Sequence, residues 1–166
     1  MKKIISILCL VAFINLYLPT FAVNVPVNTS IFISPIDTVT SKNTTIERIP
    51  CNITDDVIID NTVVFKAGSR AELQVSEVKK ARCWGNAGEI SISNGYVYDN
   101  KGQRHKVSFT KEYTGEQKDW VVPVAWVGFF FLILPIFFGF VHGGQAKVSS
   151  NSEMEVYLTS PFVFNP

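Results

Sequence analysis

Few residues of the chain have the types and spacing that acid–base or nucleophilic catalysis requires. Asp55 and Asp56 form the only adjacent pair of carboxylates. Neighbouring side chains of a strand point to opposite faces, so these two acids are poorly placed to share a proton transfer. His105 lies in a basic hairpin flank and His142 at the edge of an apolar segment, and the chain has no other histidine. We therefore predict no catalytic residues and expect that the protein is not an enzyme.

The cysteines limit the redox and metal chemistry of the chain. Cys9 lies in an apolar N-terminal run, which leaves Cys51 and Cys83 for the rest of the protein. A disulfide between these two would close a loop of about thirty residues and stabilise the fold by about 3 kcal/mol. The alternative is two separate thiols, one after Pro50 and one beside Trp84. Two cysteines without clustered histidines do not make a zinc site, so we expect no metal and no cofactor.

Four residues could form an exposed binding patch. Trp84 lies in a glycine-rich loop beside Arg82, and Tyr96 and Tyr98 fall on one face of an expected strand. Exposed aromatic and arginine side chains commonly anchor partners. The alternative is that these rings pack onto the protein itself. The glycines of WGNAGE follow no strand–helix unit, so they indicate a β-turn and not a phosphate loop.

Length and charge exclude one class of partner. The chain has 166 residues and a net charge of +1, without a long basic or acidic block. Proteins that bind nucleic acids need clustered Lys and Arg to neutralise phosphates, so we expect no nucleic-acid partner. The length suits one small domain with targeting segments.

The N-terminus has the pattern of a secretory signal peptide. Lys2 and Lys3 precede an apolar run from Ile4 to Leu18, and LPTFA follows with a helix-breaking proline and small residues. This pattern predicts that residues 1–22 are a signal peptide, cleaved after Ala22, and that the remaining chain is exported. An uncleaved signal anchor is the alternative.

Residues 23–118 show the pattern of short β-strands. Runs such as SIFIS, AELQVSEV and EISISNGYVY alternate apolar and polar residues, and clusters of Gly, Asn, Asp and Ser separate them. Such alternation places one face of each strand on a core and the other in water. We predict a mainly β domain, a small barrel or sandwich of short antiparallel strands.

One short pattern occurs three times and predicts where strands begin. An apolar residue and two variable positions precede Gly or Asn, then Ser or Thr, around Asn28, Gly68 and Asn151. Gly and Asn tolerate positive φ, so each copy predicts a tight turn that leads into a strand at a barrel corner. Chance similarity is the alternative. The residues expected to share a face after the second and third copies are Ala71, Leu73, Val75, Met154, Val156 and Leu158.

The segment Trp120–Val141 carries no charge and matches the thickness of a bilayer's hydrocarbon core. Trp120, Trp126 and His142 are expected at the membrane edges, where amphipathic side chains gather. Residues 119–142 are therefore predicted to form a transmembrane or re-entrant helical segment. An apolar core hairpin or an oligomer interface is the alternative.

The path of this segment is open at this point. Hydropathy slightly favours a single kinked span, which would place residues 143–166 across the membrane from the β domain. A re-entrant hairpin would keep both flanks on one side, so that the third copy of the repeat could complete the barrel.

The exported chain resembles a class of secreted bacterial β-barrel domains. Their copies read roughly V-P-x-G-T, an alternating strand, a D-V-x-V-D-G turn and strand, and a basic K-K stretch with regularly spaced glycines. The run from Asp55 to Ser93 carries this pattern, with Lys79, Lys80, Gly85 and Gly88 in register.

The C-terminal FVHGGQAKVSSNSEMEVYLTS is similar to the closing strand that these domains place after a hydrophobic insertion. The chain departs from the class where Asn28 and Asn151 replace the usual glycine. The resemblance implies a small envelope-associated barrel without a catalytic set of its own.

These features favour a non-enzymatic, membrane-anchored protein of the bacterial cell envelope. Its β domain would face the periplasm or the outer surface in a structural or partner-binding role. The expected partners are membrane lipid and another envelope protein that adds a strand to a free edge. The alternative is a sensing module that recognises a glycan or cell-wall component through Trp84, Tyr96 and Tyr98.

Overall fold

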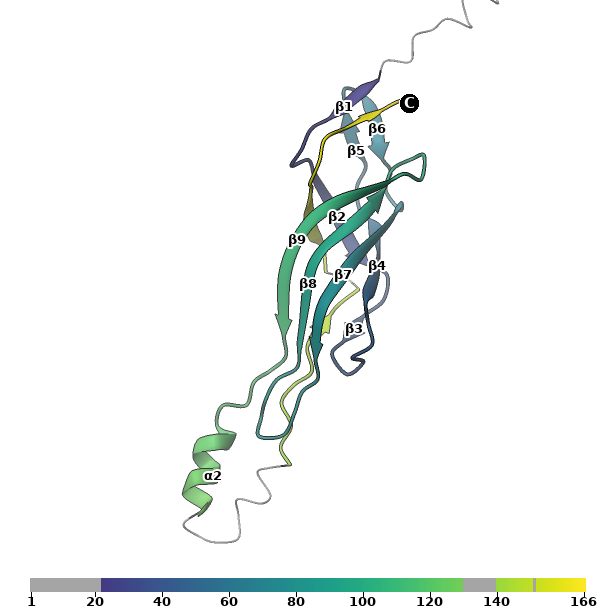
Figure 1. Ribbon diagram of the computed structural model, residues 1–166. Coiled ribbons are helices and arrows are strands. Elements are labelled where there is room, and N and C mark those ends of the chain that lie inside the picture. Colours follow the sequence, from purple (N-terminus) through teal and green to yellow (C-terminus); the bar gives the residue numbers. More distant parts are fainter. Residues whose placement is uncertain (1–21, 130–139, 151) are drawn as a thin grey trace, which may run out of the picture.

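The computed structural model describes residues 22–129, 140–150 and 152–166 of the chain. This part forms twelve strands and the helix α2 (Val121–Phe129), arranged as Figure 1 shows. The predicted signal peptide lies outside the described residues, except for Ala22. The strands are β1 (Val23–Val25), β2 (Ser30–Pro35), β3 (Val39–Thr40), β4 (Arg48–Ile53), β5 (Val57–Ile59), β6 (Thr62–Phe65), β7 (Arg70–Lys79), β8 (Glu89–Tyr98), β9 (Arg104–Thr114), β10 (Lys147–Val148), β11 (Met154–Leu158) and β12 (Phe162–Phe164).

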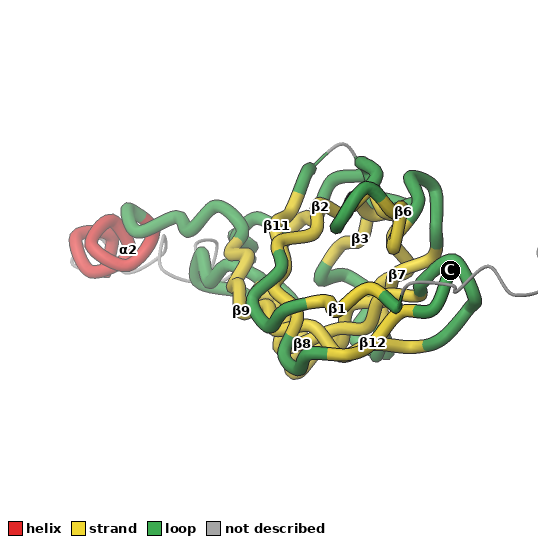
Figure 2. The backbone as a smooth tube through the Cα atoms, turned by 90° about the horizontal axis from the view of Figure 1, so that it is seen from above, coloured by secondary structure: helices red, strands yellow, loops and turns green. Residues whose placement is uncertain are grey.

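Six antiparallel strands form a closed barrel in the order β11-β2-β4-β7-β8-β9, and β9 pairs back with β11. Figure 2 looks down on the molecule and shows α2 well to one side of these strands. The prediction of a mainly β fold with a small antiparallel barrel is confirmed. Of the two architectures expected, the barrel forms and the sandwich does not.

Alternating inward side chains fill the barrel. Every second residue of β2, β4 and β11 is buried, as the alternation in the sequence predicts. Burying one such large aliphatic or aromatic side chain contributes roughly 1.5–3 kcal/mol, so the core supplies most of the driving force for folding. Among the largest fully buried side chains are Phe65, Ile31, Ile33, Ile49, Ile53, Leu73, Ile90, Ile92 and Leu158.

Each copy of the repeated pattern leads into a barrel strand. Asn28 and Gly68 have φ values of 62° and 81°, a left-handed conformation that Asn and Gly adopt at low cost. The N–H of Asn28 donates to the carbonyl of Leu158 (2.9 Å), and the N–H of Gly68 donates to the carbonyl of Ile53 (2.8 Å). Each turn thus ties the start of one barrel strand to the end of its neighbour. The predicted corner turns are confirmed at these two copies; Asn151 lies outside the described residues.

Three two-stranded ribbons extend the barrel at its ends. They pair β1 with β12, β3 with β10, and β5 with β6. Residues 143–166 therefore supply one barrel strand and half of two ribbons. The barrel is built from chain on both sides of the apolar segment.

The apolar segment leaves the barrel and returns to the same end of it. The N–H of Lys118 donates to the carbonyl of Gly85 (3.0 Å), and the N–H of Gly85 donates to the carbonyl of Val141 (2.9 Å). The N–H of Gly144 donates to the carbonyl of Glu116 (2.7 Å). Both flanks are thus held close to one loop, and Figure 1 shows α2 projecting from this end.

The slightly favoured single span, with the tail across the membrane, is wrong. β11 pairs with both β2 and β9, so residues 154–158 lie on the same side as the rest of the barrel. α2 has nine residues, and no helix in the described ranges is long and apolar enough to cross a membrane. Residues 130–139 of the predicted segment lie outside those ranges.

Candidate binding surface at one end of the barrel

The sheet of β7, β8 and β9 continues past the barrel, and there β7 loses one of its two neighbours (Figure 1). β4 pairs with β7 only from Arg70 to Gln74, and the last bond on that side runs from the N–H of Val75 to the carbonyl of Glu47 (3.0 Å). Residues 76–79 have β8 as their only partner strand within the described part of the chain. Such an edge can accept an extended peptide through its backbone groups.

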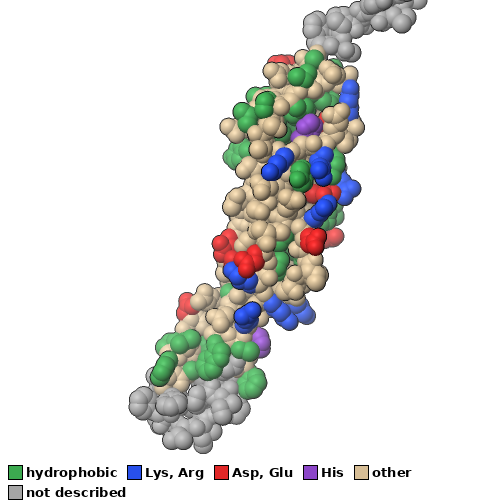
Figure 3. Space-filling view, viewed as in Figure 1, with side chains coloured by type: hydrophobic (Ala, Val, Ile, Leu, Met, Phe, Trp, Pro, Cys, Tyr) green, Lys and Arg blue, Asp and Glu red, His purple; other side chains and the backbone are tan. Residues whose placement is uncertain are grey.

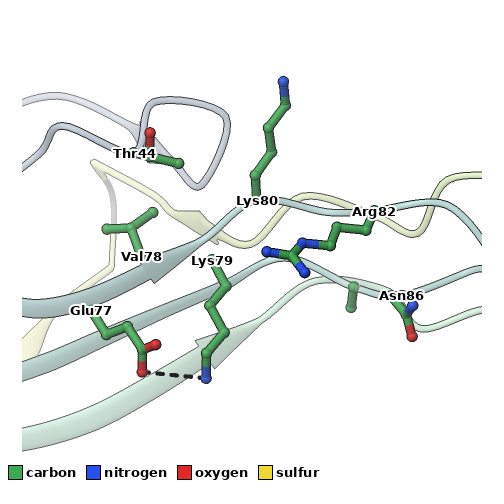
Figure 4. Close-up of a pocket in the computed structure, with 8 residues that line it drawn as sticks. Thr44, Glu77, Val78, Lys79, Lys80, Arg82 and Asn86 are labelled. Carbon is green, nitrogen blue, oxygen red and sulfur yellow. Dashed lines mark ion pairs between the residues drawn. The ribbon is translucent and has the colours of Figure 1, made fainter.

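A groove runs along this edge, between β7 and residues 44–47. Two hollows of about 350 Å³ and 550 Å³ form it, and both are lined by Thr44, Glu77 and Val78. Figure 4 shows the larger hollow, which continues onto the loop that joins β7 to β8 (residues 80–88). The residues that line it are Thr44, Glu77, Val78, Lys79, Lys80, Arg82, Asn86 and Ala87.

The loop end of the groove is positively charged. The ammonium of Lys79 lies 3.3 Å from Glu77 Oε2 and 3.0 Å from Glu89 Oε2. The hydrogen bond to Glu89 raises the pKa of Lys79, and the same bond lowers the pKa of Glu89. Lys80 and Arg82 line the same hollow and form no ion pair with another described residue. Two cationic side chains therefore lie at this end of the groove.

The loop of residues 80–88 is a turn that presents an aromatic ring. The N–H of Arg82 donates to the carbonyl of Asn86 (3.0 Å), and Nδ2 of Asn86 donates to the carbonyl of Cys83 (3.1 Å). At its tip, Trp84 and Gly85 have φ values of 63° and 76°. The loop therefore holds the Trp84 side chain 46% exposed.

Cys83 and His142 meet beside this loop, although they are 59 residues apart in the chain. Sγ of Cys83 lies 3.6 Å from Nε2 of His142, and Nδ1 of His142 lies 2.8 Å from the carbonyl oxygen of Phe140. A carbonyl can only accept, so Nδ1 carries the hydrogen and Nε2 of the neutral ring faces the thiol as an acceptor. A third hollow, of about 450 Å³, is lined by Lys80, Ala81, Arg82, Cys83, Trp84, Asn86 and His142.

The structure does not bring the four residues of the predicted aromatic patch together. Arg82 and Trp84 lie in the loop before Glu89, whereas Tyr96 and Tyr98 lie near the far end of β8. At roughly 3.3 Å per strand residue, Glu89 and Tyr96 are about 23 Å apart along β8. The patch is thus divided between the two ends of one strand.

Both tyrosines have partners on the barrel wall, as the alternative to a patch expected. The guanidinium of Arg104 lies 4.3 Å from the ring centroid of Tyr96, and that of Arg70 lies 5.6 Å from the centroid of Tyr98. The hydroxyl of Tyr98 donates to Oε1 of Glu72 (3.5 Å), and Glu72 is only 6% exposed. These contacts tie neighbouring barrel strands to one another.

The two cysteines are free and have different surroundings. Cys51 is fully buried on β4, where desolvation raises the pKa of its thiol to about 12. Cys83 is partly exposed beside His142. The interpretation as two separate thiols therefore applies, and the disulfide is not formed.

A buried acid that the sequence analysis missed organises the turn between β8 and β9. Asp99 is 5% exposed and accepts hydrogen bonds from the N–H groups of Lys101 (2.9 Å) and Gln103 (2.8 Å). Its other oxygen lies 3.1 Å from Nε2 of His105, whose ring stacks on Phe162 with centroids 3.6 Å apart. Asp at the first position of the DNKG turn was the available signal, since Asp often accepts such bonds. The pair supports the fold of this turn.

The predicted membrane-edge residues gather at the end of the molecule that carries α2. Trp120 and Trp126 are 52% and 69% exposed. Phe140, where the chain returns toward the barrel, is 71% exposed. His142 follows at the same end, against the β7–β8 loop. Figure 3 shows hydrophobic side chains gathered at this end next to a group of Lys and Arg side chains. Apolar and basic side chains therefore adjoin there.

The protein is thus a closed six-stranded antiparallel barrel, and the apolar segment 120–141 precedes its closing strand β11. No family model matches the chain, and no curated protein matches it. The small barrel that the sequence predicts is present, and β11 closes it after the apolar segment.

Proposed function

We propose that this protein is a non-enzymatic, membrane-anchored protein of the bacterial cell envelope whose exported barrel binds a partner. One observation carries the proposal: both flanks of the uncharged segment 120–141 are hydrogen-bonded at one end of the barrel. That end exposes Trp126 and Phe140, which water solvates poorly. Insertion of this end into a lipid interface would bury them.

The charges around the segment fit the same arrangement. Lys80 and Arg82 lie on the loop to which both flanks are bonded, so an inserted segment holds them at the level of the lipid head groups. Basic side chains near a bilayer surface are attracted to anionic lipids. The segment then anchors the barrel, and the barrel stays in water beside the membrane.

The partner is an acidic, extended segment of another envelope protein. The strands of a closed barrel have little free edge, and the extension of β7 at residues 76–79 offers one beside a groove. The added strand would lie in the groove beside this edge, and Lys80 and Arg82 at the end of the groove would attract carboxylates of the partner. This position lies next to the membrane-facing end of the barrel.

Vesicle flotation tests the anchor. The unmodified protein should float with vesicles of phosphatidylglycerol and phosphatidylethanolamine, and the double variant Trp126→Ser/Phe140→Ser should partition at least about tenfold less, because two aromatic side chains lose their burial. The matched control is Ile58→Ser/Val163→Ser, which changes side chains that are 60% and 62% exposed on β5 and β12. Equal flotation of both double variants, or no flotation of the unmodified protein, would contradict the proposal.

A further inference from the structure

We infer that Cys83 is a reactive thiol, activated by His142, that forms a mixed disulfide with a partner bound in the groove. The inference rests on the proposed export and partner binding, because an oxidising compartment supplies protein disulfides. The chemistry of the thiol itself depends on neither and can be measured separately.

The orientation of the imidazole provides the base. The carbonyl oxygen of Phe140 holds the hydrogen on Nδ1 of His142, 2.8 Å away. In the neutral ring Nε2 therefore carries the lone pair, and it lies 3.6 Å from Sγ of Cys83. The thiol can pass its proton to this nitrogen, and the resulting thiolate is the form of cysteine that attacks sulfur.

The side chains around Cys83 are basic. The titratable groups that line the hollow with Cys83 are Lys80, Arg82 and His142, and no Asp or Glu is among the lining residues. Among the described residues no group of three His, Cys, Asp or Glu side chains could hold a metal ion, so Cys83 and His142 do not belong to such a ligand set.

The hollow around Cys83 adjoins the groove. Lys80, Arg82 and Asn86 line both the hollow around Cys83 and the larger hollow of the groove. A disulfide at the end of a segment that lies along β7 would therefore come close to Cys83. Cys51 cannot take this role, since it is fully buried in the barrel core.

The step is thiol–disulfide exchange, which needs no separate oxidant. His142 accepts the proton of Cys83, and the thiolate attacks one sulfur of the partner's disulfide. The Sγ–S bond forms as the partner's S–S bond breaks, and the leaving thiolate takes the proton from the imidazolium. One covalent link forms for each molecule, without turnover.

Oxidised glutathione is the probe for the thiol. Its reaction with the full-length folded protein is followed by peptide mass mapping from acidic to alkaline pH. The His142→Gln variant should react about tenfold more slowly near neutral pH and should approach the unmodified protein at high pH, where hydroxide removes the proton. His142 is exposed, so this change leaves the core intact. The control is His105→Gln, which changes the other histidine of the chain and should leave the rate unchanged.

Identical pH–rate profiles for His142→Gln and the unmodified protein would overturn the role of His142. Slow modification of Cys83, at a rate no higher than in urea, would overturn its reactivity. In cells, non-reducing gels of the envelope should show a disulfide-linked species that Cys83→Ser removes, and its absence would overturn the proposed link. A species of twice the mass of the chain would make the partner a second copy and overturn the assignment to another protein. Failure of vesicle binding with normal glutathione kinetics would count against the membrane anchor alone.

Discussion

Leu158 and Tyr157 provide a direct test of the closing strand β11. Leu158 is 1% exposed and points into the barrel, whereas the neighbouring Tyr157 is 43% exposed. The backbone of Leu158 is hydrogen-bonded to the turn that precedes β2. Its N–H donates to the carbonyl of Thr29 (3.0 Å), and its carbonyl accepts from the N–H of Asn28 (2.9 Å). Substitution by Ala at either position keeps these backbone bonds. At Leu158 it removes side-chain packing, and at Tyr157 it also removes a side-chain hydrogen bond with Glu155.

The expected costs differ because only one of the two side chains fills the core. Leu158→Ala should destabilise the fold by about 3 kcal/mol, from lost burial and the cavity that remains. Tyr157→Ala should cost roughly 0.5–1 kcal/mol, as for a partly exposed side chain. With a urea dependence of about 2 kcal/mol per molar, the midpoint of unfolding should fall by about 1.5 M for Leu158→Ala.

Urea unfolding of the full chain in a mild detergent, followed by far-UV circular dichroism, measures both variants under the same conditions. The slope of the transition should stay unchanged, so that midpoints can be compared as free energies. A midpoint shift for Leu158→Ala no larger than that for Tyr157→Ala would refute the place of residues 154–158 in the barrel core. The third copy of the repeated pattern would then have no structural role.

Three further predictions concern single residues. Lys79 lowers the pKa of Glu89, so their contact contributes stability that is present above the unfolded-state pKa of Glu and is lost as pH falls through the folded pKa. In the Glu89→Gln variant the urea midpoint should therefore change less with pH between about pH 5 and pH 3 than in the unmodified protein. The same pH dependence in both proteins would contradict the contact. Burial raises the pKa of Cys51 to about 12, so iodoacetamide at mildly alkaline pH should alkylate Cys83 and spare Cys51 in peptide maps of the folded protein; equal labelling would show that Cys51 is accessible. Gly68 has a φ of 81°, and an added Cβ would meet nothing within 4 Å. Gly68→Ala should therefore lower the free energy of unfolding by about 1–2 kcal/mol through the backbone alone, and Gly68→Asn should lower it less. An Ala variant with an unchanged urea midpoint would contradict the corner turn.

The alternation of side chains made the strands predictable, because each strand shows its buried face within a few residues. Met154, Val156 and Leu158 are all buried, as the third copy of the repeat predicts. In the second copy Ala71 and Leu73 are buried in the same way, whereas Val75 is half-buried, between two shifts in the β7–β8 register. Strand faces follow from local sequence, since successive side chains of an extended chain point to opposite sides.

The aromatic patch shows where local sequence stops being sufficient. Trp84 and Tyr96 are twelve positions apart in the sequence, and a tight hairpin would have placed them near each other. The ten-residue length of β8 instead carries Tyr96 toward the other end of the barrel. Strand length depends on how far β7 and β9 pair with β8, and that pairing involves residues from other parts of the chain.

The apolar segment was misjudged for a related reason. Hydropathy measures how well residues 120–141 suit a lipid environment, but it carries no information on where the chain goes afterwards. The pairing of Val156 with Ile31 in β2 decides that the chain returns to the barrel. A span that separated these residues would leave β2 and β9 without the strand that joins them.

The sequence by itself determined the strands, the positive-φ turns at Asn28 and Gly68, and the position of the uncharged segment. These features depend on the conformational preferences and hydropathy of residues close together in the chain. Only the tertiary structure decided that β11 closes the barrel, that β7 keeps an open edge, and that His142 faces Cys83. Each of these joins segments far apart in the chain, so it depends on the register and lengths of several strands together and on no single stretch of sequence.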